Sequence, residues 1–209
     1  RMTVEALIAR LEHESKALKI WNKTGSWMIY CPDYCLSPSC EELDQDIDWQ
    51  QDEIKIFGRS IDLPRLTAWY GDAGAAYVYS GIRNDPKPWT ERLSRVREKL
   101  EVDIGIDFNS VLANRYADGQ QHQGYHADDE KELGPAPLIA SLSFGASRRF
   151  LVKAKGKGTK AEAFDLENGS LLMMGGAMQK DYVHKIAKST RVQGPRINLT
   201  FRQIKSLDP

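Results

Sequence analysis

Apolar and polar positions follow a helical period in the first part of the chain. In residues 3–18 (TVEALIARLEHESKAL), apolar side chains recur three and four positions apart after a threonine, which predicts an amphipathic N-terminal helix. A strand is expected at 27–31 (WMIYC), and the Ser-Pro-Ser at 37–39 predicts the start of an acidic helix that continues to about residue 49. The sequence PWTERLSRVREKL predicts a further helix from near Pro88, with the proline in its first turn.

The second half of the chain consists of short β-rich runs separated by Gly, Pro, Asn and Asp. Several strands at this spacing are typical of a β-sandwich or barrel. Because helices come first and strands follow, the order predicts an α+β domain, and the glycine inside IKIFGRSI (54–61) adds a hairpin upstream. The runs are SVLANRY (110–116), LIASLSF (138–144), RRFLVKA (148–154), AEAFDL (161–166), GSLLMM (169–174), DYVHKI (181–186) and RINLTFRQI (196–204).

Size and cysteine content favour one globular domain in a reducing compartment. The 209 residues, 41% of them hydrophobic, are enough for one continuous core. No apolar run approaches the roughly 18 residues that cross a bilayer, and no secretory segment is recognised. Cys31, Cys35 and Cys40 are odd in number and lack a fourth metal ligand nearby, so we expect reduced thiols and an intracellular protein.

Charge is balanced overall but unevenly distributed. The chain has 29 basic and 29 acidic residues, with seven acids and no base at 41–53 and six bases and no acid at 148–160 (RRFLVKAKGKGTK). Because phosphate attraction acts over about 8–10 Å, a basic loop can bind nucleic acid even on a neutral protein. The alternative is an ordinary solvated hairpin.

Two of the four histidines offer a metal site. His126 and Asp128 lie two positions apart, so in an extended chain an imidazole and a carboxylate point the same way. With His184, which follows 58 residues later in a predicted strand, they would form the facial triad of non-haem Fe(II) oxygenases. A His-x-Asp in a surface loop and a histidine satisfied within a strand are the alternatives.

The last predicted strand carries polar residues that alternate strictly with apolar ones. Guanidinium groups pair with carboxylates in charge-assisted forks, so this face would suit a dicarboxylate. The alternative is an amphipathic strand with a solvated outer face. Asn114 and Tyr116, again two apart, stand on a second strand ahead of the His-x-Asp pair. The polar residues of the last strand are Arg196, Asn198, Thr200 and Arg202.

Several short motifs occur together in this chain. They are YGDAGAAYVYSG at 70–81, PKPW at 86–89, NRY at 114–116, HADD at 126–129, SLSFG at 141–145, GSLLMM at 169–174, His184 and PRINLTFR at 195–202. In combination they resemble AlkB-type Fe(II)- and 2-oxoglutarate-dependent dioxygenases, most closely the duplex-DNA-active nuclear members and their bacterial relatives. The resemblance covers roughly residues 50 to 204.

The resemblance implies an α+β fold with a double-stranded β-helix (jelly roll) core. One domain, 1–209, would comprise an N-terminal helical region at about 1–50, a nucleotide-recognition hairpin lid at about 51–92 and the catalytic core at about 105–204. The implied reaction couples 2-oxoglutarate decarboxylation to hydroxylation of N-alkyl groups on DNA bases, such as 1-methyladenine and 3-methylcytosine, and releases formaldehyde. The implied cofactors are Fe(II), 2-oxoglutarate and O₂, with ascorbate as an accessory reductant.

The resemblance also assigns residues to the metal and co-substrate. His126, Asp128 and His184 would hold the metal. Arg196 would clamp the distal carboxylate of 2-oxoglutarate, and Arg202, counted with the catalytic residues, would lie near the iron-chelating carboxylate. The residues that complete the pocket would be Asn114, Tyr116, Asn198 and Thr200.

Further residues are expected to contact the DNA. Phe57, an apolar residue at a hairpin tip, would fill the gap that a flipped base leaves, unless it folds back onto the core. Tyr79 would stack on the base and Asp129 would accept from its exocyclic amine; a core tyrosine and a solvated acid are the alternatives. The other candidate substrate contacts are Arg59, Tyr77, Glu130 and Arg148, of which Arg59 and Arg148 would touch phosphates.

The expected partner is alkylated DNA, double-stranded rather than single-stranded or RNA, bound by a monomer in the bacterial cytoplasm or the nucleus. Alternative hypotheses keep the same iron chemistry, with RNA, a protein side chain or a small molecule as the substrate. A metal-free β-barrel binding module is the rival from a different class.

Overall fold

The computed structural model describes residues 2–79 and 82–205, without the side chains of Tyr79 and Ile82. The two N-terminal helices begin at side-chain caps. Helix α1 (Val4–Glu14) follows Thr3, whose hydroxyl accepts from the Ala6 amide. Helix α2 (Cys40–Asp46) follows Ser39 in a reciprocal capping box with Glu42, and it ends three residues before the expected limit at 49.

Helix α3 (Glu91–Ile104) begins later than the sequence predicts. Thr90 is its N-cap and accepts a hydrogen bond from the Leu93 amide, so Pro88 precedes the helix instead of lying in its first turn. A threonine side chain can satisfy one of the free amides at a helix start, which a proline cannot do. The prediction of a helix here is confirmed, and its starting residue is corrected.

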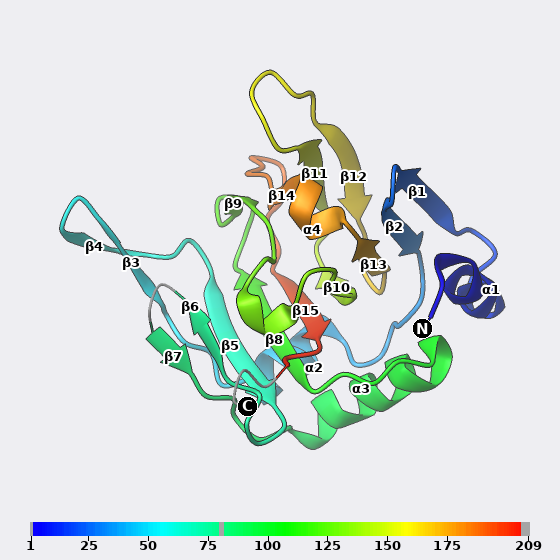
Figure 1. The fold of residues 1–209 in the computed structure, drawn as a ribbon. Helices are drawn as coiled ribbons and strands as arrows, with labels where there is room; N and C mark the ends of the chain where they lie inside the picture. Colours follow the sequence, from blue (N-terminus) through cyan, green and yellow to red (C-terminus); the bar gives the residue numbers. More distant parts are fainter. Residues whose placement is uncertain (1, 80–81, 206–209) are drawn as a thin grey trace.

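Two large sheets form the core, and all seven runs of the second half are strands of them (Figure 1). The seven-stranded sheet has the order β1-β2-β13-β10-β15-β8-β5 and the four-stranded sheet the order β12-β11-β14-β9. The first consists of β1 (Lys19–Lys23), β2 (Ser26–Cys31), β13 (Leu171–Gly176), β10 (Ile139–Gly145), β15 (Arg196–Arg202), β8 (Ser110–Tyr116) and β5 (Leu66–Gly71). The second consists of β12 (Glu162–Leu166), β11 (Arg148–Ala154), β14 (Tyr182–Ile186) and β9 (Gln123–His126).

Apolar clusters pack on both sides of the large sheet. Leu7, Leu11, Leu93 and Leu100 of α1 and α3 belong to the same buried cluster as Leu199 of β15, so the helices cover one face of this sheet. A second cluster holds residues from both sheets, among them Tyr116, Phe150, Val152, Ile186 and Met174. The polar side chains of β15 lie on the strand face opposite Leu199, between the sheets. The α+β fold with a jelly-roll core is confirmed, and the solvated outer face suggested as an alternative for β15 is wrong.

Two hairpins lie outside the core sheets. Strands β3 (Glu53–Ile56) and β4 (Arg59–Asp62) form a hairpin that projects from the body (Figure 1). Its turn residues Phe57 and Gly58 both have positive φ, 48° and 78°. A bulky residue rarely adopts this conformation. Strands β6 (Tyr77–Tyr79) and β7 (Ile82–Asn84) form the second hairpin.

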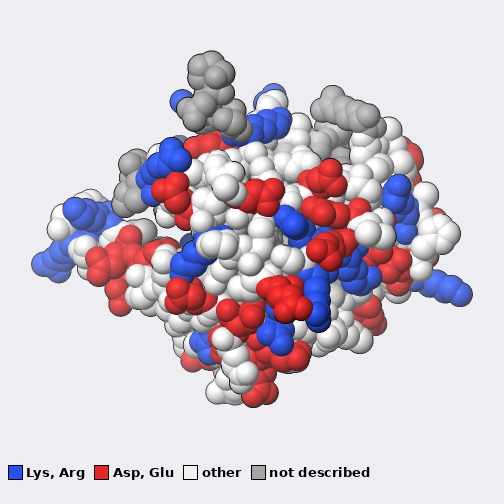
Figure 2. Space-filling model, turned by 90° about the horizontal axis from the view of Figure 1, so that it is seen from below, with Lys and Arg blue, Asp and Glu red and all other residues white. Residues whose placement is uncertain are grey.

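The acidic segment at 41–53 is paired within the protein. Asp44 bonds Arg115 at 2.6 Å, and Asp46 lies 3.4 Å from Arg92. Acidic and basic side chains are accordingly intermixed over the face seen in Figure 2. The segment is therefore a structural element held by basic residues of α3 and β8. In the described part of the chain, no helix is long and apolar enough to span a membrane.

Candidate active site

A pocket between the two sheets brings together most of the residues singled out in the sequence. The polar face of β15 forms one wall, and β9 and β14 form the opposite one. The pocket is lined by Leu112, Asn114, Tyr116, Gln123, His126, Asp128, Ser141, Phe150, Leu166, Met174, His184, Ile186, Arg196, Asn198, Thr200 and Arg202.

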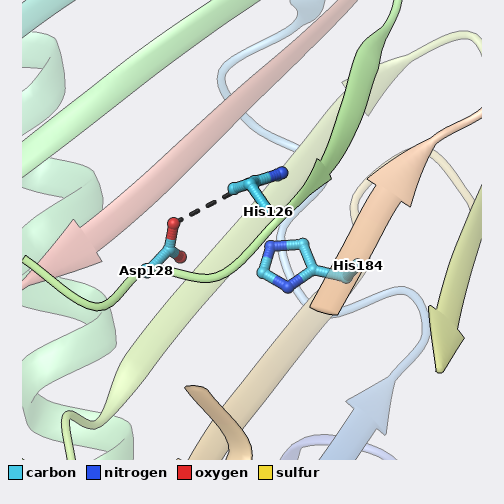
Figure 3. Close-up of side chains that lie close together, drawn as sticks. All are labelled: His126, Asp128 and His184. Atoms are coloured by element: carbon cyan, nitrogen blue, oxygen red, sulfur yellow. Dashed lines mark ion pairs between the residues drawn. The ribbon is translucent and has the colours of Figure 1, made fainter. Parts of the chain in front are cut away.

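His126, Asp128 and His184 converge on one point of this pocket (Figure 3). His126 ends β9 and pairs in register with His184 on the neighbouring strand β14, while Asp128 follows two residues after β9. Each residue offers one ligand atom, and these atoms lie within 4.8 Å of one another. Nδ1 of His126 lies 2.8 Å from the Gly124 carbonyl oxygen, which leaves Nε2 as its ligand atom.

The protonation states of this cluster suit a divalent cation. Burial lowers the pKa of His184 to about 3, so its imidazole is neutral at physiological pH. Burial alone would raise the pKa of Asp128, but the charged Arg202 guanidinium, which also bonds this carboxylate, lowers it, so the carboxylate is charged. Nδ1 of His184 is buried and has no hydrogen-bond partner within the described residues. A neutral imidazole, as in His184, and an ionised carboxylate, as in Asp128, are the forms in which these side chains bind a metal.

Arg196 is the main cationic group of the opposite wall. Its side chain is buried, and its Nη2 donates to Ser143 Oγ at 2.9 Å. Burial lowers its pKa to about 10, which keeps the guanidinium charged near neutrality. Its Nε and Nη1 find no partner among residues 2–79 and 82–205. Buried guanidinium donors without acceptors are costly, so this position would suit an anion.

Hydrogen bonds order the other polar side chains of the pocket. Thr200 donates to Asn198 Oδ1 at 2.8 Å, and Asn198 donates to Ser141 Oγ at 2.6 Å. Tyr116 donates to Gln123 Oε1 at 3.2 Å. Arg202 Nη2 lies 2.9 Å from Asp128 Oδ1 and so joins the polar face of β15 to the cluster of His126, Asp128 and His184.

The predicted substrate residues have different environments. Asp129 is exposed and lies 3.5 Å from Lys155 Nζ. Glu130 is half-buried, its Oε2 has no hydrogen-bond partner among the described residues, and burial raises its pKa. Tyr77 packs on Trp69 at 4.5 Å, and Arg59 is exposed on β4. The side chain of Tyr79 lies outside the described residues.

Arg148 is not a phosphate contact, and its assignment is corrected. The side chain is 1% exposed and donates to the main-chain oxygens of Asp118, Gln121 and Ala187 at 2.9, 2.7 and 2.8 Å. It lies on the same face of β11 as Phe150 and Val152, which point into the core. Strand alternation therefore outweighs the charge of the surrounding run.

Replacing Arg148 by methionine is expected to destabilise the protein by about 2–4 kcal/mol, because three partly buried carbonyl groups lose their donor. Urea unfolding would measure this loss. Lys157→Ala, at an exposed position of the same basic run, is the matched control and should leave the midpoint unchanged. Equal midpoints for Arg148→Met and the parent would contradict the structural role.

Several residues that line the pocket or bond to its lining were missed in the sequence. Ser141 and Ser143 alternate with apolar residues along β10, so the rule that singled out β15 could have found them. Arg65 donates from Nε to Asn114 Oδ1 at 3.0 Å, and Gln179 accepts from the Asp128 amide at 3.0 Å. These two pairs are 49 and 51 residues apart, and no local pattern indicates them.

Comparison with known proteins identifies the class. The family model described as "2OG-Fe(II) oxygenase superfamily" matches residues 34–202, which include the whole pocket. The solved structure titled "The structure of OsALKBH1" superposes with a TM-score of 0.60 over 88% of this chain and 100% of that chain, at 17% identity. That likeness concerns the fold alone.

Two similar proteins show to which type of 2OG-Fe(II) oxygenase this chain belongs. Mouse "DNA oxidative demethylase ALKBH2" is 42% identical over 173 residues, 78% of this chain and 72% of that protein. Human "Alpha-ketoglutarate-dependent dioxygenase alkB homolog 3" is 40% identical over 173 residues, 78% of this chain and 60% of that protein. The chain belongs to the 2OG-Fe(II) oxygenase superfamily. Within it, the chain is an AlkB-type dioxygenase, whose cofactors are Fe(II), 2-oxoglutarate and O₂.

Proposed function

We propose that this enzyme repairs DNA by oxidative removal of alkyl groups from bases such as 1-methyladenine and 3-methylcytosine. The observation that carries the proposal is the cluster of half-buried His126 with buried Asp128 and His184, in the same pocket as the Arg196 guanidinium, whose Nε and Nη1 have no partner among the described residues. The names of the mouse and human relatives support DNA as the substrate.

The three converging side chains would hold Fe(II), and Arg196 would hold 2-oxoglutarate. When bound, the metal and co-substrate supply the oxidising power that hydroxylates the alkyl carbon, after which formaldehyde is lost. Nε and Nη1 of Arg196 offer two donors to the distal carboxylate. Arg202 bonds the Asp128 carboxylate at 2.9 Å. The apolar side chains of Phe150, Leu166 and Met174 line the same pocket and limit water.

A base in a duplex must leave the stack to reach this buried cluster, which costs a few kcal/mol. Asp129 and Glu130 come directly after Asp128 in the sequence, and there they would accept a hydrogen bond from the exocyclic amine of the base. Tyr77 and Tyr79 would contribute to base stacking from β6. The Val78 amide donates to Glu132 Oε1 at 2.9 Å, and this bond joins β6 to the segment that carries Asp129 and Glu130. Exposed Arg59 would contact phosphate.

Phe57 supports duplex DNA as the preferred form. Its side chain is 103% exposed, at the tip of a projecting hairpin, and so does not fold back onto the core. We expect Phe57→Ala to lower turnover of a methylated duplex about tenfold or more, since a wedge in the stack contributes roughly 1–3 kcal/mol. A methylated single strand of the same sequence should lose much less. The measured quantity is the ratio of the two losses.

Leu36→Ala is the control for the loss of an exposed apolar side chain, since Leu36 is 61% exposed and lies outside the hairpin. Equal losses of Phe57→Ala on both substrates would assign Phe57 to the pocket or the fold and remove the main support for a duplex substrate.

The dealkylation itself is tested by mass spectrometry of a methylated duplex oligonucleotide incubated with Fe(II) and 2-oxoglutarate. Loss of the methyl group with one succinate per formaldehyde would support the proposal. If the methyl group stays on duplex and single-stranded DNA but is removed from the matching RNA, the substrate is RNA and the proposal of DNA repair is wrong. We also propose that the protein is an intracellular monomer with one domain over 1–209. Light scattering tests this state, because it measures the molecular mass in solution.

A further inference from the structure

The buried side chain of Gln179 lies outside the cluster of His126, Asp128 and His184, but it is bonded to the main chain of Asp128. Oε1 of Gln179 accepts a hydrogen bond from the Asp128 amide at 3.0 Å. Gln179 is 2% exposed and Asp128 4%. No sequence motif singled out Gln179, and the metal and co-substrate assignments do not include it.

The Asp128 amide depends on a side-chain acceptor because the strand has already ended. Strand β9 stops at His126, and residues 127–130 adopt no regular structure. A buried amide without a ladder partner must find another acceptor. Gln179 provides this acceptor on the main-chain side of the residue, and Arg202 bonds the carboxylate on the other side at 2.9 Å. Asp128 is therefore held at both ends.

The segment around Gln179 is itself fixed. Gln179 lies in the short helix α4 (Met178–Asp181), which joins β13 to β14 and ends just before the strand that carries His184. Lys155 anchors this turn, since its amide donates to the Asp181 oxygen at 2.8 Å and its Nζ to the Gln179 oxygen at 2.9 Å. Nε2 of Gln179 lies 3.6 Å from Met174 Sδ, which orients the amide with Oε1 toward Asp128.

We propose that Gln179 is a positioning residue that sets Asp128 relative to His126 and His184 for metal binding. This inference rests on the proposed metal site. The bond connects the segment after β9 with the connection that leads into β14, so it links the two parts of the chain that supply the ligands. Groups that orient metal ligands typically change metal affinity 10–100-fold when removed.

The test measures binding of Mn²⁺ alone to metal-free protein, by the electron paramagnetic resonance signal of the free ion. Gln179→Leu keeps the size of the side chain and removes the acceptor, and it should weaken Mn²⁺ binding at least about tenfold. Gln179→Glu keeps an acceptor oxygen at the same reach and should bind no more than about threefold more weakly than the parent. Met178→Leu, a volume-conserving change in the same turn, should bind like the parent.

The outcomes separate this inference from the metal site itself. Asp128→Ala is the reference: if it binds Mn²⁺ as the parent does, the proposed metal site fails and the role of Gln179 fails with it. If Asp128→Ala binds weakly while Gln179→Leu stays within twofold of the parent, only the inference about Gln179 is overturned. Equal losses in Gln179→Leu and Gln179→Glu, or in Gln179→Leu and Met178→Leu, also overturn it, because packing and not the acceptor would then matter.

Thermal melting of the metal-free proteins shows that each variant is folded at the temperature of the titration. If Gln179→Leu does not fold, Gln179→Asn takes its place and is judged by the same limits. Its amide is one methylene too short to reach Asp128, so it should weaken Mn²⁺ binding while it preserves the polarity of the buried site.

Discussion

Alanine at His126, Asp128 or His184 is expected to abolish dealkylation while the protein stays folded. Three ligands on one face of the ion are the minimum of this type of site, and in the described part of the chain no second such cluster stands nearby to replace a lost one. Formaldehyde release from a methylated duplex, at saturating Fe(II) and 2-oxoglutarate, measures the effect.

Asp128→Asn is the matched control for the shape of that ligand. An asparagine keeps an oxygen that can accept from Arg202, whose Nη2 lies 2.9 Å from Asp128 Oδ1, but it removes the charge that balances the metal. Activity should fall strongly in this variant with a smaller change in the melting temperature than in Asp128→Ala. Full activity in His184→Ala would exclude His184 from the site.

Arg196→Ala is expected to raise the apparent KM for 2-oxoglutarate about 30-fold or more. Loss of the guanidinium leaves a buried carboxylate of the co-substrate without its partner, at a cost of roughly 2–5 kcal/mol. Steady-state titration of 2-oxoglutarate at fixed Fe(II) and DNA measures the change.

Arg149→Ala provides the comparison for this prediction. Arg149 is an exposed arginine of β11 that lies 3.2 Å from Asp165, outside the pocket, so its removal should leave the KM for 2-oxoglutarate unchanged. A KM within twofold of the parent in Arg196→Ala would show that another group holds the co-substrate.

Strand β15 shows which structural features can be predicted from the sequence and which cannot. Its alternation correctly predicted that Arg196, Asn198, Thr200 and Arg202 share a face. It could not predict which face is buried, because every residue of β15 is buried, the apolar ones against the helices and the polar ones in the pocket. Only the family resemblance indicated that the polar face looks inward.

Other features were not readable from local patterns. Strand β9 has only four residues, two of them exposed, and gave no strand signal although it carries a candidate ligand. Arg148 was assigned to the surface because its neighbours are basic, while its burial depends on carbonyl groups up to 39 residues away. The bond between Gln179 and Asp128 likewise depends on the packing of distant segments.

The position of β15 affects how the chain can fold during synthesis. This strand lies between β8 and β10 in the interior of the large sheet, yet it is the last strand of the described residues. β8 and β10 therefore cannot be joined until residue 202 has left the ribosome, and the cavity between the sheets lacks a wall until then. Folding consequently requires contacts of long sequence separation, which makes it slow and exposes unfinished sheet edges to aggregation. A stop codon ahead of Arg196 should yield insoluble protein instead of a folded domain without activity.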